Sequence, residues 1–134
     1  MKSPEVKKIT SILFAQELES CIQFWTDRLG FQKTVEVPEG DKIAFAILEK
    51  NGVELMYQSF ASAEKDNAAT GAEARKGPSF LYIEVDDLNA AVEATKGAEV
   101  VLPVRSTFYN AKEFGVKDPA GHYLIFAQQG AGGM

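Results

Sequence analysis

The pattern of hydrophobic and polar positions repeats itself about seventy residues apart along the chain. In each half a short apolar run precedes an acidic residue, an amphipathic stretch and further short apolar runs. Such a duplication is typical of two small modules that bury a core together. The matched positions in the amphipathic stretches are Leu18 with Leu88, Cys21 with Ala91, and Ile22 with Val92.

The first half predicts one helix and four strands. Apolar residues recur at helical spacing through residues 17–29, and Gly30 can end that helix as a left-handed cap. The turn pair Asn51-Gly52 predicts a hairpin between the last two strands. The predicted strands cover residues 8–15, 31–37, 43–48 and 53–58.

The second half predicts the same order of elements. A helix over residues 87–96 begins at an N-cap on Asp86 or Asp87 and ends at Gly97. The predicted strands cover residues 79–85, 100–104, 113–117 and 122–128, and the last two join through a turn at 118–121. We therefore expect a single domain over 1–134, with module one at 8–58, a linker at 59–78 that can hold a short helix, and module two at 79–128.

Strand alternation predicts which side chains the helices cover. The expected covered face holds Leu13, Ala15, Val53, Leu55, Leu81, Ile83, Val85, Leu124 and Phe126. The expected opposite face holds Thr10, Ile12, Phe14, Ile43, Phe45, Glu54, Met56, Gln58, Phe80, Tyr82, Glu84, Phe114, Val116, Tyr123 and Ile125. The second set is more apolar and aromatic than a solvent-facing sheet should be, so a ligand or a partner chain is expected to cover it.

Composition and charge narrow the classes of partner. Apolar residues make up 46% of the chain and charged residues 25%, which is typical of globular proteins. The formal net charge of −5 disfavours nucleic acid and anionic membrane surfaces and is compatible with cationic ligands. No apolar run approaches the roughly 20 residues needed to span a bilayer. A single cysteine predicts a reducing, cytoplasmic location.

Three segments resemble the vicinal oxygen chelate superfamily, which includes glyoxalase I, extradiol dioxygenases and bleomycin-resistance proteins. They are residues 18–31, which end in Phe-Trp-Thr-Asp-Arg-Leu-Gly-Phe, the run Asn-Gly-Val-Glu-Leu at 51–55, and residues 109–124 with Asp-Pro-Ala-Gly. The resemblance implies an α+β fold of two paired βαβββ modules, whose curled mixed sheets form a cleft with the helices outside. It is specific for the fold and weak for the activity.

The resemblance also carries the superfamily's four metal positions onto this chain, at Thr10, Glu54, Phe80 and Ile125. Only Glu54 is a competent ligand, whereas a transition metal needs three or four nitrogen, sulfur or carboxylate donors. We therefore expect no cofactor and no metal, which places the chain nearest the metal-free bleomycin-resistance-like branch.

Glu54 is the sharpest candidate for a site residue. It is interpreted as a cleft carboxylate that pairs with a cationic or hydrogen-bonding ligand group, or as a strand glutamate paired with a nearby lysine. Aromatic and apolar neighbours could stack on a flat ligand. The predicted ligand-binding set is Glu54, Phe45, Met56, Phe80, Tyr82, Tyr109, Phe114 and Ile125.

The remaining candidates favour structural roles. Trp25 and Cys21 lie on the apolar stripe of the first helix and are predicted to be core. His122 follows a turn glycine, so an exposed turn histidine is the favoured interpretation.

Two functions fit these residues. The first is a metal-independent homodimer that sequesters a partly aromatic ligand, cationic or neutral, in its cleft. The second is a glyoxalase- or lyase-type enzyme with Glu54 as base and a metal held through Gln58, Glu84 or Tyr82. The dimer follows from the apolar face, and we expect neither nucleic acid nor a membrane as partner.

Overall fold

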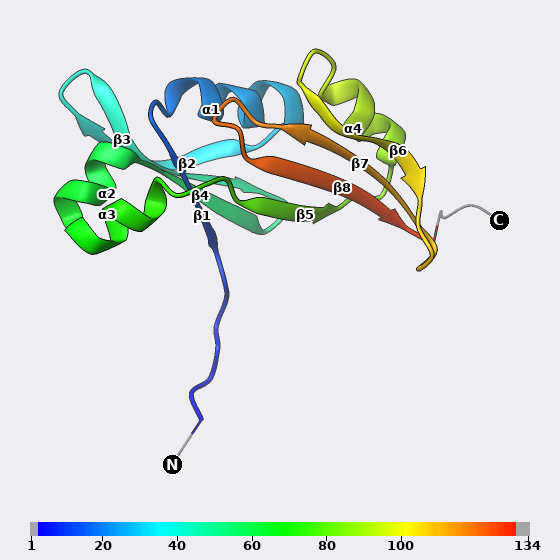
Figure 1. Cartoon of the computed structure of the whole chain (residues 1–134), viewed down its shortest axis with the longest axis horizontal. Helices are drawn as coiled ribbons and strands as arrows, with labels where there is room; N and C mark the ends of the chain where they lie inside the picture. Colours follow the sequence, from blue (N-terminus) through cyan, green and yellow to red (C-terminus); the bar gives the residue numbers. More distant parts are fainter. Residues whose placement is uncertain (1–2, 131–134) are drawn as a thin grey trace.

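A computed structural model describes residues 3–130, and its elements follow the predicted order (Figure 1). The first half contains β1 (Ser11–Ala15), α1 (Glu19–Gln23), the π-helical turn η1 (Phe24–Arg28), β2 (Gln32–Glu39), β3 (Lys42–Lys50) and β4 (Val53–Ser59). The connection holds α2 (Phe60–Asp66) and α3 (Ala68–Ala74). The second half contains β5 (Phe80–Glu84), α4 (Leu88–Ala94), β6 (Val100–Ser106), β7 (Ala111–Lys117) and β8 (Tyr123–Gln129).

The eight strands form two separate mixed sheets with the same topology. The first sheet has the order β1-β4-β3-β2 and the second has the order β5-β8-β7-β6, each with one parallel pair. Helices α1 and α4 lie on the same side of the two sheets (Figure 1). The predicted α+β fold of paired βαβββ modules is confirmed, but the predicted curling is wrong, because the sheets are uncurled.

Local sequence explains where the main elements begin and end. The Glu17 carboxylate accepts from the Ser20 backbone N–H at 2.6 Å and from the Ser20 hydroxyl at 2.6 Å, so it satisfies donors at the start of α1. Asp87 caps α4 as predicted, because its side chain accepts from Ala90 N–H. Asn51 and Gly52 have φ values of 56° and 80°, which suit the predicted two-residue hairpin.

The connection between the modules is more ordered than the predicted linker. Ser59 and Asn67 cap α2 and α3 by accepting from backbone N–H groups three residues later. Gly71 of α3 approaches α2 so closely that a Cβ atom there would lie 2.4 Å from the Cα of Glu64. The two helices therefore pack as a hairpin in which only glycine fits at this contact.

Strand register corrects part of the predicted face assignment. Phe114 pairs with Phe126 and Val116 pairs with Leu124, so all four share the face that α4 covers. Phe114 is 7% exposed and Val116 is fully buried, so the prediction that they lie on the opposite face is wrong. Val53 was expected to be covered, but it begins β4 and is exposed.

The register also defines the face opposite α1 and α4, which we call the open face. In the first sheet it holds Ile12, Phe14, Phe45, Ile47, Glu54, Met56 and Gln58. In the second sheet it holds Phe80, Tyr82, Glu84, Glu113, Tyr123, Ile125 and Ala127.

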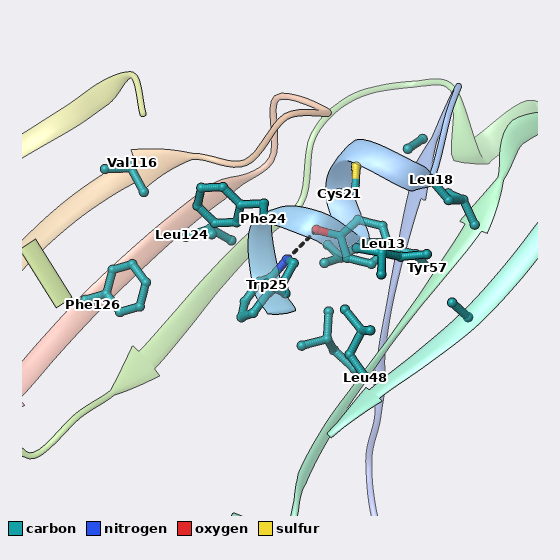
Figure 2. Packing of buried hydrophobic residues seen from close by; sticks show 14 of the residues in the cluster. Leu13, Leu18, Cys21, Phe24, Trp25, Leu48, Tyr57, Val116, Leu124 and Phe126 are labelled. Atoms are coloured by element: carbon teal, nitrogen blue, oxygen red, sulfur yellow. Dashed lines mark hydrogen bonds between the residues drawn. The ribbon is translucent and has the colours of Figure 1, made fainter. Parts of the chain in front are cut away.

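One hydrophobic core lies beneath α1, η1 and α4 and joins the two modules (Figure 2). Trp25 is 2% exposed, which confirms the prediction that it is core. Its indole Nε1–H donates to the Tyr57 hydroxyl at 2.7 Å, and that hydroxyl donates to Asp118 Oδ2 at 2.5 Å. Asp118 belongs to the β7–β8 turn, so this buried chain of hydrogen bonds fastens module two onto module one.

His122 forms a second set of hydrogen bonds between the modules. It is 4% exposed, so the prediction of an exposed turn histidine is wrong. Its Nδ1 accepts from the Ser79 backbone N–H at 2.8 Å, which leaves Nε2 protonated to donate to the Phe14 carbonyl oxygen at 2.7 Å. The ring therefore links the end of β1 to the residue before β5.

Candidate ligand-binding site

A groove of about 900 Å³ runs along the free edge of β5, between the two sheets. Ligand pockets commonly measure 300–1,000 Å³, so the groove is large enough for a small organic molecule. It is lined by Ser11, Trp25, Leu29, Phe31, Lys50, Asn51, Val53, Glu54, Leu55, residues 80–86 and Phe126.

The lining of the groove combines apolar walls with acidic side chains. Leu29, Phe31 and Phe126 belong to the hydrophobic core or pack against it. The acidic lining residues are Glu54, Glu84 and Asp86. Lys50 is the single basic lining residue in the described part of the chain, and its Nζ donates to the Leu29 carbonyl oxygen at 2.7 Å. The arrangement suits an apolar molecule that carries a positive group.

Glu54 occupies the first-module side of this groove. Its side chain is 27% exposed, and its Oε1 lies 2.5 Å from Nζ of Lys8. Lys8 belongs to the irregular segment before β1 and is itself 65% exposed. Among the described residues, the ionic partner of this carboxylate is thus one lysine side chain that is itself largely in water.

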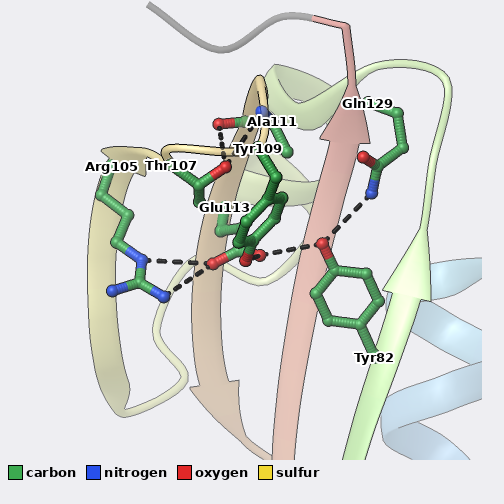
Figure 3. A network of polar contacts seen from close by, with 7 residues as sticks. All are labelled: Tyr82, Arg105, Thr107, Tyr109, Ala111, Glu113 and Gln129. Atoms are coloured by element: carbon green, nitrogen blue, oxygen red, sulfur yellow. Dashed lines mark hydrogen bonds and ion pairs between the residues drawn. The ribbon is translucent and has the colours of Figure 1, made fainter.

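A second carboxylate, which the sequence analysis missed, lies on the open face of the second sheet (Figure 3). The side chain of Glu113 is 1% exposed and sits under a layer of partly exposed side chains. Its Oε1 accepts from Arg105 Nε at 3.2 Å and Nη2 at 2.9 Å. Its Oε2 accepts from the Tyr82 hydroxyl at 2.8 Å and from the Tyr109 hydroxyl.

Glu113, Arg105, Tyr82 and Tyr109 form what we call the Glu113 cluster. Their hydrogen bonds set the protonation of Glu113 and Tyr109. Burial pushes the pKa of Glu113 upward, but the hydrogen bonds from Tyr109, Arg105 and Tyr82 outweigh burial and hold the pKa below its ordinary value. The same bond to Glu113 is the main cause that raises the pKa of Tyr109 to about 12. At neutral pH the cluster therefore contains the Glu113 carboxylate, the Arg105 guanidinium and the neutral phenol of Tyr109.

The buried cysteine takes no part in either site. Cys21 is 1% exposed, as predicted. Burial first, then the charges of Asp118 and Glu17, raise the pKa of its thiol to about 12. The group is therefore an un-ionised thiol at neutral pH and a poor nucleophile.

The model of the Glyoxalase/Bleomycin resistance protein/Dioxygenase superfamily matches residues 7–126. The chain belongs to this superfamily. The match extends from the segment before β1 into β8 and so includes both modules, the groove and the Glu113 cluster. No curated protein sequence is similar enough to be matched to the chain.

Solved structures share the superfamily fold at low sequence identity. TioX from Micromonospora sp. ML1 aligns with a TM-score of 0.75 and 17% identity, over 91% of this chain and 99% of its own. A glyoxalase/bleomycin resistance protein/dioxygenase from Nocardioides aligns with a TM-score of 0.74 and 22% identity, over 98% and 89%. A lactoylglutathione lyase from Agrobacterium tumefaciens gives 0.73 and 14%, over 93% and 95%. Identities this low support a shared fold.

The four positions that the resemblance assigns to metal ligands carry residues that do not fit a metal. Of Thr10, Glu54, Phe80 and Ile125, only Glu54 carries a strong donor. Within residues 3–130, no group of three or more His, Cys, Asp or Glu side chains is placed to hold an ion. Gln58, one of the atypical donors considered, instead donates to the Ser62 hydroxyl at 3.1 Å.

The structure divides the predicted ligand-binding residues into four groups. Glu54, Phe80 and Tyr82 line the groove together. Phe45, Met56 and Ile125 lie on the open face but do not line the groove. Tyr109 belongs to the Glu113 cluster. Phe114 lies in the core under α4, so it cannot contact a ligand on the open face.

Register across the β7–β8 hairpin could have revealed Glu113. Phe126 was correctly placed under the helices, and its partner across the hairpin is Phe114. If Phe114 faces the helices, then Glu113 faces the open side. Alternation alone does not reveal this, because Phe114 and Val116 are apolar and suit either face until the register of the hairpin is known.

Proposed function

We propose that the chain is a metal-independent small-molecule binding protein of the bleomycin-resistance-like type. Its ligand would be partly aromatic, would carry a cationic group, and would lie in the groove between the two sheets. The observation that carries this proposal is that Glu54, Phe80 and Tyr82 line one groove whose other walls are mainly apolar.

Each part of the ligand has a matching part of the groove. Phe80 is 67% exposed and Tyr82 is 52% exposed, so both offer aromatic surface to a flat molecule. Phe80 also stacks on Tyr123 with ring centroids 4.6 Å apart, which holds the Phe80 ring in place. Glu54, Glu84 and Asp86 supply negative charge for the cationic group.

We propose further that the protein is a cytoplasmic homodimer. Exposed apolar side chains on the open face of the first sheet, such as Ile12 at 44%, favour a partner copy over water. The one cysteine, which is unpaired, suits a reducing compartment. In the described residues no helix is both long enough and apolar enough to cross a membrane. Light scattering at micromolar concentration should give about twice the chain mass of 14.6 kDa.

A thermal-shift screen against aromatic antibiotics and metabolites, with and without divalent metals, tests the binding function. A ligand at 100 times its dissociation constant adds about 2.7 kcal/mol to the free energy of unfolding. Hits should appear without added metal, and a chelator should leave Tm unchanged. A fall of several degrees on chelation that one metal restores would contradict metal independence.

Benzamidine, a flat aromatic cation, then serves as a defined probe for the groove. Glu54→Gln should weaken its binding by roughly 1.5–3 kcal/mol, the range for a hydrogen bond to a charged group. Folding should be unaffected because glutamine has the same size. The matched control is Glu73→Gln, which removes an exposed carboxylate paired with Lys76 on the surface. Equal benzamidine affinities in wild type and Glu54→Gln would refute the role of Glu54.

The enzymatic alternative requires Glu54 to act as a base with a metal held by atypical donors. Tyr82 and Glu84 do line the groove with Glu54. Within residues 3–130, however, no three of the His, Cys, Asp and Glu side chains are placed so that they could hold an ion together. We therefore propose binding rather than catalysis as the function of the groove.

A further inference from the structure

We propose that Arg105 forms a second binding site, on the open face of the second sheet, for a carboxylate carried on an aromatic body. This site is distinct from the groove and binds the opposite charge. It consists of the outer edge of the Arg105 guanidinium, with Tyr109 and Phe108 of the β6–β7 turn beside it.

The first argument is that Glu113 has no capacity left for a ligand. A carboxylate has about four lone-pair sites. Glu113 accepts four hydrogen bonds, two from Arg105 and one each from Tyr82 and Tyr109. A ligand cation would therefore have to break an existing bond to reach this carboxylate, so the cluster does not select cations.

The second argument concerns the donors that remain on Arg105. A guanidinium carries five N–H donors in a rigid plane. Nε and one hydrogen of Nη2 are directed at Glu113 Oε1. Both hydrogen bonds to Glu113 come from Nε and Nη2, and Figure 3 shows Nη1 pointing away from Glu113. The outer pair of nitrogens, Nη1 and Nη2, is left as a fork that matches the two oxygens of a carboxylate.

The third argument is that the cluster fixes the guanidinium in place. Two hydrogen bonds hold the Arg105 plane, while 54% of its side chain stays exposed. The Tyr82 hydroxyl, which also holds Glu113, itself accepts from Gln129 Nε2 at 3.1 Å. Burying a carboxylate and a guanidinium partner adds little stability by itself. What the arrangement supplies is a pre-positioned donor fork that loses little freedom when it binds.

The aromatic neighbours indicate the rest of the ligand. Phe108 is 98% exposed and Tyr109 is 44% exposed, and their rings meet edge to face with centroids 4.9 Å apart. Tyr109 is bonded to the same carboxylate as Arg105, so its ring lies close to the guanidinium. A flat aromatic group attached to a carboxylate can therefore contact Tyr109 while its oxygens reach the fork.

Benzoate titrated into the full-length protein tests this site, and benzamide serves as the uncharged control of the same shape. Binding is followed by calorimetry and by the NMR resonance of the Arg105 Nε–H group. We expect saturable benzoate binding that shifts this resonance, and at least tenfold weaker binding of benzamide. Arg105→Gln should weaken benzoate binding at least tenfold.

Two further variants separate loss of the fork from loss of the fold. Arg105→Lys keeps the positive charge beside Glu113 but lacks the fork, so it should stay folded and still bind benzoate several-fold more weakly. Arg28→Gln is the matched control, because Arg28 donates to the Lys96 carbonyl oxygen and lies over the Phe24 ring. It should leave benzoate binding unchanged.

Several results would overturn the proposal. Equal affinities for benzoate and benzamide would show that only the aromatic ring is bound. Unchanged benzoate affinity in both Arg105 variants would place the anion elsewhere. A change in dimer mass in Arg105→Gln with unchanged benzoate affinity would show that the fork serves a second copy of the chain. Glu54→Gln with benzamidine tests the groove separately, because that variant leaves the Arg105 cluster intact.

Discussion

Each of the two sheets carries a glutamate on its open face, and the two glutamates are held in opposite ways. Glu54 in the first sheet has one ionic partner, Lys8, which comes from an irregular and exposed segment. Glu113 in the second sheet is buried and accepts four hydrogen bonds from side chains of its own module. We propose that the first carboxylate exchanges its partner for a ligand, whereas the second is fully occupied.

The difference teaches that the position of a carboxylate on a sheet does not by itself give its role. A buried charge needs partners that satisfy it, and those partners then become the groups that present donors to the surface. In the second sheet the consequence is that Arg105, and not Glu113, faces the solvent. In the first sheet the carboxylate itself remains available.

The largest expected effect is on folding. Glu113→Ala should lower the free energy of unfolding by about 2–3 kcal/mol, because hydrogen bonds to a charged group are lost and their donors become unpaired. Glu54→Ala should lower it by less than about 1 kcal/mol, since its one partner is an exposed lysine. Urea denaturation of both variants at pH 7 measures the two values.

Both variants remove the same side chain from the open face of a sheet, so each is the control for the other. If the two cost the same, then the hydrogen bonds of Glu113 contribute no more than one surface ion pair. The comparison between the two carboxylates would then be wrong.

The second prediction concerns Tyr109, whose hydroxyl donates to Glu113. That bond is the main cause that raises the pKa of Tyr109 from its ordinary value of 10.0 to about 12. In Glu113→Gln the pKa of Tyr109 should return toward 10, because the negative acceptor is gone. The measurement is the NMR signal of the tyrosine ring carbon that bears the hydroxyl, followed from pH 8 to 12.5, with Tyr109→Phe to assign it.

The sign of the linked stability follows from the raised pKa. The contribution of Tyr109 is complete below pH 10 and is lost as the pH rises through about 12. An unchanged tyrosine titration in Glu113→Gln would mean that the two side chains are not bonded in solution.

Much of the fold could be predicted from the sequence because its signals are local. The helical spacing through Leu18 and Ile22, the Asn51-Gly52 turn and the Asp87 cap each depend on a few neighbouring residues, and each appears where it was expected. The duplication then predicted that the second half repeats the helix and strands of the first in the same order along the chain. The uncurled shape of the sheets depends on how the two modules pack together, and no local sequence pattern predicts that packing.

The site was less predictable because it depends on contacts between distant residues. Glu54, Phe80 and Tyr82 were found by alternation and line one groove. His122 was assigned to an exposed turn from its Gly121 neighbour, but its ring bonds to groups 43 and 108 residues away in the chain. Nothing near His122 in the sequence indicates those partners.

The third prediction tests how the contribution of Glu113 to stability changes at low pH. The pKa of Glu113 lies below its ordinary value of 4.5, so its ionised form stabilises the fold above that pH. This contribution is lost as the pH falls through the lowered pKa. The difference in stability between wild type and Glu113→Gln should therefore shrink below about pH 4.

Urea denaturation at pH 7, 5, 4 and 3 measures this change. Glu64→Gln is the control, because Glu64 also has a lowered pKa but owes it to the exposed Arg75 side chain. A gap between wild type and Glu113→Gln that is the same at pH 7 and pH 3 would show that the charge of Glu113 does not stabilise the fold.

The smallest expected effect concerns competition between Lys8 and a ligand for the Glu54 carboxylate. Lys8 and a ligand cation compete for the same carboxylate, because Lys8 Nζ lies 2.5 Å from Glu54 Oε1. An exposed ion pair of this kind contributes about 0–1 kcal/mol, so Lys8→Ala should tighten benzamidine binding by up to about fivefold.

Lys7→Ala is the control, since it removes a neighbouring positive charge from the same exposed segment and leaves Lys8 in place. Calorimetric titration of the three proteins with benzamidine gives the comparison. Tighter binding in Lys8→Ala alone would show that a replaceable partner occupies Glu54. Weaker binding in Lys8→Ala would mean that Lys8 supports the ligand, and Glu54 would then be as fully committed to its own chain as Glu113 is.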